Sequence, residues 1–427
     1  MSRQSRQWTM LTLCLGLFAC LYLAITSLPT HHASRHHQQL PKLTPHEWIH
    51  QHSHLPPPSS SNNRRRRRRP RAALISLVRS SELPGILQSM SQLEYHFNRH
   101  HHYPWHFFSE TAFTPAFINA TSSATRAPTS YHLIPHAHWS IPDFISRDRF
   151  IQSLDYVGAL GVGKGHMVSY RHMCRWNSRF FYQHPALRDY DYYWRVEPDV
   201  HFFCSIPYDP FALFAEFGFV YGFNMAILDD ARSFPSLWPA TRDFIAKNPQ
   251  LLHPEADPSW LFDLDAVGGG GGGIDSVYNN CQFFSNFELG DLNFFRGNHS
   301  SANMNAAHDL YVRHLDRLGG FFYERFGDAP IHTLSVSLFA PRDRHPQFCA
   351  CEPTPLDENF YKLVPMQSPQ RKPADTCLRM WLDGSRWFGG GGGSKGTGWL
   401  EKKPGWARDV ELAWGGDGYG GYVRQGV

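Results

Sequence analysis

The chain has 427 residues, of which 42% are hydrophobic and 15% aromatic, so it can bury one large core or two lobes. Six of its positive charges form the run Arg64–Arg69, and without them the formal net charge falls from +4 to −2. The globular part is therefore slightly acidic, which argues against a nucleic-acid partner.

An apolar segment near the N-terminus predicts a membrane anchor. Residues Trp8–Leu28 carry no charge, and they have about the ~20 residues that a bilayer requires. Arg3 and Arg6 precede this segment, which predicts a cytosolic tail at 1–7 and a lumenal chain after residue 28. No small-residue cleavage site is clear, so we favour an uncleaved, single-pass type II signal anchor over a removed signal peptide.

Residues 29–70 are rich in His, Pro and Ser and are predicted to form a disordered lumenal stem. The arginine run Arg64–Arg69 lies in this stem. It could touch nucleic acid or anionic lipid, but no aromatic platform surrounds it, so a solvated stem or a basic processing site is the interpretation we favour.

Six cysteines follow the anchor, and an oxidising lumen would allow them to form disulfides, with the pairing left open. They are Cys174, Cys204, Cys281, Cys349, Cys351 and Cys377.

Strand-like and helix-like patterns alternate from residue 71 onward, which predicts an α/β sandwich with a mostly parallel sheet. Strands are expected at Ala72–Val78, Trp105–Phe108, Tyr192–Val196 and Phe217–Ile227, and helical or mixed patterns at Glu82–Phe97, Phe150–Tyr156, Tyr170–Tyr182 and Pro330–Phe339. Glycine runs cannot pack a core. Gly268–Gly273 is therefore interpreted as a loop insertion, and Gly389–Gly393 as part of a low-complexity tail at 386–427.

An acidic pair, Glu197 and Asp199, follows the expected strand Tyr192–Val196. Residues two apart in an extended segment face the same side, so both carboxylates could ligate Mn²⁺ or Mg²⁺ and, through the ion, a nucleotide diphosphate. The carboxyl end of a strand is also where such sheets bind ligands. The alternative is an ordinary turn.

A second carboxylate, Glu288, is flanked by Phe283, Phe284 and Phe287. A carboxylate among aromatic rings could serve as a nucleophile, a base or an electrostatic partner of an oxocarbenium ion. The alternative is an ion pair with an arginine such as Arg296.

Two further groups of polar residues have both a functional and a structural interpretation. The segment Tyr170–Arg175 offers a phenol and two cations for phosphates or hydroxyls, or else it is an amphipathic helix with exposed arginines. Asp328, near an expected helix start, could be an N-cap.

Long motifs in the chain closely resemble the fungal Golgi α-1,2-mannosyltransferases, glycosyltransferase family 15, from about residue 71 to about residue 382. The motifs are Ser169–Arg175, Tyr190–Val200, Tyr221–Ile227, Phe283–Phe295 and Gly319–His332. The resemblance implies a GT-A-like domain at 71–385 in the Golgi membrane. It also implies transfer of mannose from GDP-mannose, with retention, to mannose on N- or O-linked glycans of glycoprotein acceptors.

The resemblance also implies roles for single residues. Glu197 and His345 would bind Mn²⁺, Glu288 would be the nucleophile, and Tyr170 would lie near the reacting sugar. The residues expected to contact the substrates are Arg79, Arg171, Asp199, Asn286 and Asp328.

One segment departs from the family pattern, because the stretch between Pro341 and His345 is shorter than usual in this family. His332 is the fallback for the metal-binding histidine. A shortened segment could also have cost the protein its metal site. A catalytically inactive lumenal homologue, acting as a binding or scaffold protein, is therefore the alternative hypothesis.

Overall fold

The structure is a computed structural model that describes residues 43, 45–53, 69–202, 206–224, 226–263, 277–297 and 307–345. The chain divides into two compact units, 1–44 and 45–427, and every element below belongs to the second. The expected anchor, both glycine runs and the tail lie outside the described residues. Within the described part, no helix has the length and apolarity needed to cross a membrane.

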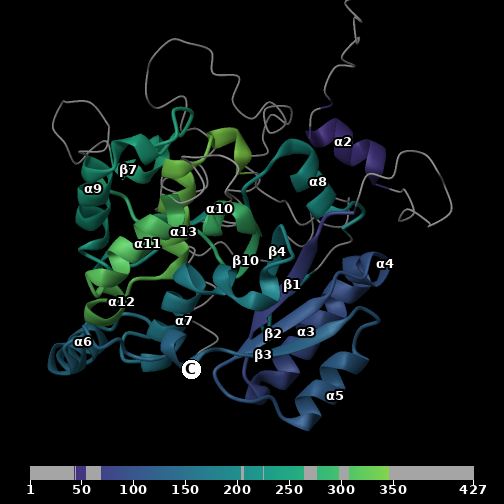
Figure 1. The fold of residues 1–427 in the computed structure, drawn as a ribbon, viewed down its shortest axis with the longest axis horizontal. Coiled ribbons are helices and arrows are strands. Elements are labelled where there is room, and N and C mark those ends of the chain that lie inside the picture. The colour runs from purple at the N-terminus through teal and green to yellow at the C-terminus, as the bar shows by residue number, and fades with distance from the viewer. Residues whose placement is uncertain are drawn as a thin grey trace, which may run out of the picture. The chain divides into compact units, whose positions relative to one another are not determined.

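The centre of the fold is a six-stranded mixed sheet with the strand order β3-β2-β1-β4-β10-β5 (Figure 1). Strands β3, β2, β1 and β4 run parallel, and β10 is antiparallel to both of its neighbours. The bounds are β1 Ala72–Leu77, β2 Trp105–Ser109, β3 Thr129–Leu133, β4 Tyr192–Val196, β5 Tyr221–Phe223 and β10 Phe287–Asp291. The predicted α/β fold with a mostly parallel sheet is thus confirmed.

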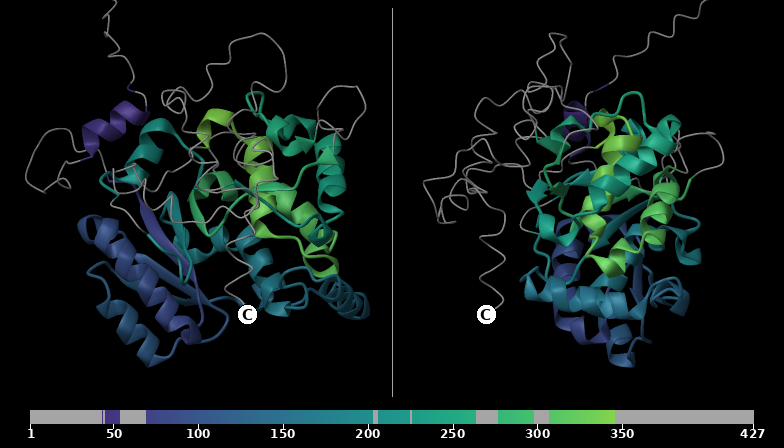
Figure 2. Two further views of the ribbon diagram at one scale, coloured as in Figure 1. Left: turned by 180° about the vertical axis from the view of Figure 1, so that it is seen from behind. Right: turned by 90° about the vertical axis from the view of Figure 1, so that its left-hand side faces the viewer.

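Helices cover the two faces of this sheet, because successive side chains of each strand point to opposite faces. On one face, Tyr193 packs in the large apolar core with side chains of α7 (Val168–Arg179), α11 (Ala307–Arg317) and α13 (Asp328–Phe339). On the other face, Trp194 contacts the ring of Phe97 next to α3 (Leu83–Leu93), and Phe107 contacts a ring of α5 (Pro115–Ser123). The two helical groups lie on either side of the sheet in Figures 1 and 2.

Shorter elements complete the unit. The helices are α2 (Pro45–His52), α4 (Arg99–His101), α6 (Arg147–Ala159), α8 (Pro210–Phe217), α9 (Leu237–Lys247), α10 (Leu292–Arg296) and α12 (Gly320–Tyr323). The two small sheets pair β6 (Ala226–Leu228) with β9 (Cys281–Phe283), and β7 (Phe262–Asp263) with β8 (Val277–Tyr278).

The structure corrects three expectations. Part of the stem is folded: α2 contacts α8, and its Trp48 is only 4% exposed and stacks on His52. The single strand expected at Phe217–Ile227 is instead two short strands in different sheets, β5 and β6. Cys174 is a buried free thiol. Cys281 is disulfide-bonded, and the other four cysteines after the anchor lie outside the described residues.

Candidate functional site

The carboxyl ends of β1, β2 and β4 carry charged residues at one edge of the sheet. Arg79 follows β1, Glu110 follows β2 and Glu197 follows β4. Arg79 Nε donates to Glu110 Oε1 over 2.5 Å, and the Arg79 side chain is 42% exposed. After β1 the chain continues to β2, which pairs with one side of β1, whereas β4 pairs with its other side. The strand order therefore reverses at β1, and such a topological switch point is where open α/β sheets bind their ligands.

Glu197 and Asp199 do not face the same side, because the chain turns after β4. Asp199 adopts a left-handed backbone with φ of 59°, and its N–H donates to the carbonyl of Gly85 over 3.2 Å. Its carboxylate lies so close to α3 that a Cβ on Gly85 would be 2.6 Å from Asp199 Oδ1. Glu197 Oε1 instead accepts from Arg195 Nε over 2.5 Å. The expectation of a same-sided pair, which assumed an extended segment, was therefore wrong.

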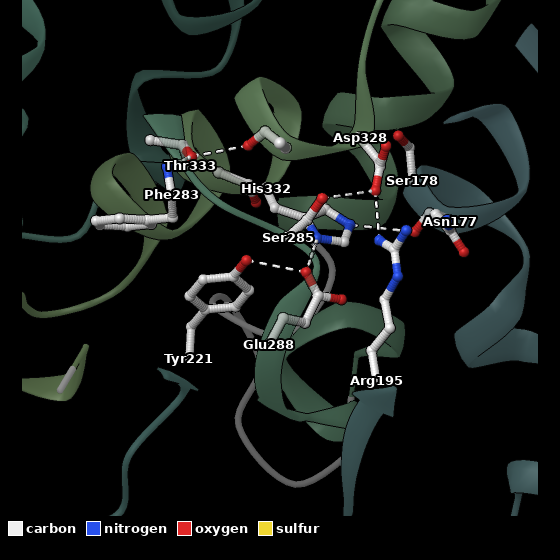
Figure 3. A network of polar contacts seen from close by, with 12 residues as sticks. Asn177, Ser178, Arg195, Tyr221, Phe283, Ser285, Glu288, Asp328, His332 and Thr333 are labelled. Carbon is white, nitrogen blue, oxygen red and sulfur yellow. Dashed lines mark hydrogen bonds and ion pairs between the residues drawn. The ribbon is translucent and has the colours of Figure 1, made fainter. Parts of the chain in front are cut away.

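Arg195 joins the strand end to the helical layer. Besides Glu197 it binds Asp328, the first residue of α13, which also accepts from the Ser285 hydroxyl over 3.2 Å (Figure 3). Asp328 is not the N-cap, because that position is Gly327. Burial alone would raise the pKa of Asp328, but the charges of Arg195 and His332 together with the hydrogen bonds that Asp328 accepts outweigh it and lower that pKa.

Glu288 lies directly opposite Arg195 in the β4–β10 pair and accepts hydrogen bonds from two tyrosines. Tyr193 donates to Oε1 over 2.8 Å, and Tyr221 donates to Oε2 over 2.9 Å. Both tyrosines stand opposite Gly290 on the flanking strands. A Cβ on Gly290 would be 2.3 Å from the Tyr193 ring. Because glycine has no side chain, the ring can lie over Gly290 and its hydroxyl can reach Glu288.

His332 of α13 is the third partner of Glu288. Its Nδ1 is 3.1 Å from Glu288 Oε2, and its Nε2 is 3.1 Å from the Asn177 carbonyl oxygen. Glu288 is 1% exposed and His332 is fully buried. Burial alone would raise the pKa of Glu288, but the charges of His332 and Arg195 outweigh it and lower that pKa. Both ring nitrogens are engaged, which removes His332 as a fallback metal ligand.

The ion pair between Glu288 and Arg296 that was the alternative interpretation does not form. Arg296 instead donates to backbone carbonyls, including that of Leu187 at 3.1 Å. Glu288 therefore belongs to a polar network that was not evident from the sequence.

Tyr170, in the first turn of α7, is held by an arginine that the sequence analysis did not single out. Arg325 Nη1 donates to the Tyr170 hydroxyl over 3.1 Å, and Nη2 reaches Asp229 over 3.2 Å and the Ser233 hydroxyl. Arg325 is 6% exposed. It lies in the motif Gly319–His332, but its role depends on an aspartate that is far away in sequence.

Arg171 and Asn286 are less directly connected to this network. Arg171 is fully buried and donates to the carbonyls of Gly165, Phe321 and Phe322, so the structure does not present it to a phosphate. Burial lowers its pKa to about 10. Asn286 is half-buried in the turn before β10.

The two expected metal ligands lie at opposite ends of β4. His345 is placed by the residue before it, Arg344, whose carbonyl accepts from the Val220 N–H. The Val220 carbonyl in turn accepts from the N–H of Asp291, which pairs with the first residue of β4. Glu197 follows the last residue of that five-residue strand, which spans ~16 Å at about 3.3 Å per residue. His345 is 4% exposed, and burial lowers its pKa to about 3.

A metal ion therefore fits this site only in part. Glu197 offers hard carboxylate oxygens at the carboxyl edge of the sheet, whereas His345 does not join it in this structure. Among the residues that the structure describes, no three or more His, Cys, Asp or Glu side chains form a group that could hold a metal.

Known proteins match this chain over most of its length. A family model described as "Glycolipid 2-alpha-mannosyltransferase" matches residues 30–350. The chain is 38% identical to O-glycoside alpha-1,2-mannosyltransferase omh1 of Schizosaccharomyces pombe, over 64% of this chain and 65% of that protein. It is 36% identical to Alpha-1,2 mannosyltransferase KTR1 of Saccharomyces cerevisiae, over 73% and 72%. The chain thus spans slightly less than two thirds of omh1.

Two solved structures share the fold. Core-mannan synthase A (CmsA/Ktr4) of Aspergillus fumigatus, in a Mn/GDP form, superposes with a TM-score of 0.62 at 40% identity, over 70% of this chain and 77% of that chain. The mannosyltransferase Ktr4p of S. cerevisiae, in complex with GDP, gives a TM-score of 0.65 at 28% identity, over 80% and 92%.

Proposed function

Because the chain belongs to the glycolipid 2-α-mannosyltransferase family, we propose that it transfers mannose from GDP-mannose to a 2-hydroxyl of a mannoside with retention of configuration. The observation that carries the proposal is the ionised, triply hydrogen-bonded Glu288. It lies directly opposite Arg195, which binds Asp328 and Glu197 at the carboxyl edge of the sheet. The names of the relatives favour this activity over the inactive-homologue hypothesis.

The nucleotide would bind at the switch point. Arg79 lies there with its side chain half-exposed and paired with Glu110. If Arg79 bound a phosphate oxygen in place of Glu110, its positive charge would lie against the diphosphate. Glu197 would supply a carboxylate ligand to manganese, which a homologous structure contains. When bound, the metal would stabilise the negative charge on the departing GDP.

Glu288 can act on the sugar through one oxygen. Oε2 already accepts from Tyr221 and His332, whereas within the described part of the chain Oε1 accepts from Tyr193 alone, which leaves it one lone pair there. In a double displacement, Oε1 would bond to the anomeric carbon as the bond to phosphate breaks and its electron pair leaves with GDP. The acceptor hydroxyl would then attack the same carbon and give its proton to a phosphate oxygen of GDP, as the bond to Oε1 breaks and Glu288 is released as a carboxylate. In a front-face reaction, Glu288 would only stabilise the positive charge while the acceptor enters on the side of the leaving group.

Tyr170 is proposed to lie near the reacting sugar, with its hydroxyl oriented by Arg325. Asn286 and Asp328 would contribute polar contacts to the substrates. We further propose N- or O-linked glycoproteins as acceptors and a Golgi location, with the anchor at 8–28 in the membrane and the domain in the lumen.

The test is transfer by the purified full-length chain in detergent, with GDP-mannose as donor and α-methyl-mannoside as acceptor. Release of GDP coupled to formation of a disaccharide supports the proposal, and Glu288→Ala should abolish both. Folded protein that binds GDP but forms no product would favour the inactive homologue.

A further inference from the structure

We propose that His332 is the positioning residue of Glu288: it carries a proton on both ring nitrogens and holds the carboxylate ionised, with Oε2 saturated and Oε1 left to face the sugar. The functional part of this inference rests on the proposed transferase activity, but the protonation state does not.

The placement follows from two matching spacings. Arg195 and Glu288 are direct neighbours across β4 and β10. Asp328 and His332 are four residues apart on α13, so they lie on one face of that helix. Asp328 binds Arg195 and His332 binds Glu288, so the helix meets the strand pair with two parallel charge contacts (Figure 3).

Hydrogen-bond partners fix the number of protons on this pair. A backbone carbonyl can only accept, so His332 Nε2, which faces the Asn177 carbonyl, must bear a hydrogen. A neutral imidazole has only one N–H, and Nδ1 would then face the lone pairs of Glu288 Oε2 at 3.1 Å without a proton between them. One additional proton must therefore lie between Nδ1 and Oε2.

This proton belongs on the histidine, because Glu288 accepts two further hydrogen bonds, from Tyr193 and Tyr221, and such bonds favour the ionised carboxylate. The charges of the surroundings agree. Among the described residues, the three carboxylates Glu197, Asp328 and Glu288 adjoin one arginine, Arg195, so a cationic His332 reduces the excess of negative charge in this group.

His308 of α11 is a second histidine beside His332, with ring centroids 5.6 Å apart, and its contacts suit a neutral ring. Its Nε2 faces the Ser178 carbonyl over 3.0 Å, and its Nδ1 is 2.8 Å from the Ser335 hydroxyl, which can donate to it. Two adjacent cationic rings would repel each other, and burial with the charge of His332 holds the pKa of His308 well below its ordinary value. The proton is thus assigned to His332 alone.

Nitrogen-15 NMR of the full-length protein labelled at histidine tests the protonation state without any activity. We expect one ring, identified by its loss in His332→Asn, to be protonated on both nitrogens at pH 7.5. That signature should persist in the control His308→Gln and disappear in Glu288→Gln. A single neutral tautomer at His332 in the unaltered protein would overturn the proposal.

Two variants of His332 test the positioning role. An Asn amide nitrogen can replace Nδ1 and keep a donor to Glu288, whereas a Gln amide nitrogen replaces Nε2 and keeps only the bond to Asn177. We expect His332→Gln to lose ~10–100-fold in kcat, as for a lost hydrogen bond to a charged group, with an unchanged KM for GDP-mannose. His332→Asn should retain several-fold more activity. Equal losses in both variants, at equal thermal stability, would mean that His332 only fills space.

Discussion

Gly290 is predicted to be essential because the ring of Tyr193 occupies the place where its side chain would be. In Gly290→Ala the new Cβ would lie 2.3 Å from Tyr193 Cε1 and 2.8 Å from the hydroxyl oxygen. The ring is fully buried, so it cannot move into solvent. We expect a cost of about 1–3 kcal/mol for the overpacking and another ~1.5–3 kcal/mol for the lost hydrogen bond to the Glu288 carboxylate.

Urea unfolding of the purified protein measures this cost. Gly163→Ala is the matched control, because a Cβ there would meet nothing within 4 Å, and we expect it to change the free energy of unfolding by less than ~0.5 kcal/mol. Tyr193→Phe removes only the hydroxyl. Because Gly290→Ala already breaks that bond, the double variant should lose less stability than the two single variants together. Equal stability of Gly290→Ala and Gly163→Ala would refute this reasoning.

Three further predictions follow from other parts of the structure. Arg325→Lys should lower kcat with little change in the free energy of unfolding, because a lysine cannot bridge Tyr170 and Asp229 at once; unchanged kcat would show that the Tyr170 hydroxyl needs no support. Arg79→Ala should weaken GDP binding in calorimetry, whereas equal affinity would place the diphosphate elsewhere. His106, whose pKa is lowered to about 4 mainly by burial, is neutral in the fold, while the unfolded chain takes up its proton near pH 6.5. Its contribution to stability is therefore lost as the pH falls from 6.5 towards 4, and unfolding of His106→Gln should depend less on pH over that range.

The sequence predicted the elements that local patterns encode. The apolar run at β1 and the aromatic run at β4 were found with nearly correct bounds, as was the helix at α13. The predicted strand end placed Glu197 at the carboxyl edge of the sheet, and this position is confirmed. Arg79, which only the resemblance had singled out, lies at the same edge. Both successes depend on periodicity and on strand direction, which neighbouring residues determine.

The contacts of the site could not be predicted in the same way, because they depend on register between distant segments. Glu288 meets Arg195 only through the pairing of β4 with β10, and it meets His332 only because α13 packs over that pair. Arg171 looked like a phosphate ligand, but it donates to the nearby Gly165 carbonyl and to the carbonyls of Phe321 and Phe322, which are distant in sequence. The left-handed turn at Asp199 occurs where the residue contacts Gly85 of the distant helix α3.

The most direct test of the central claim is the structure of the product formed from GDP-mannose and α-methyl-mannoside. The purified chain would be incubated with Mn²⁺ or with EDTA, and the disaccharide analysed by NMR for linkage and anomeric configuration. The predicted product is an α-1,2-linked mannobioside that forms in the presence of Mn²⁺. It should not form when EDTA is added or when Glu288→Ala replaces the unaltered protein. A β-linked product would contradict retention, and full activity of Glu288→Ala would contradict the role assigned to the carboxylate.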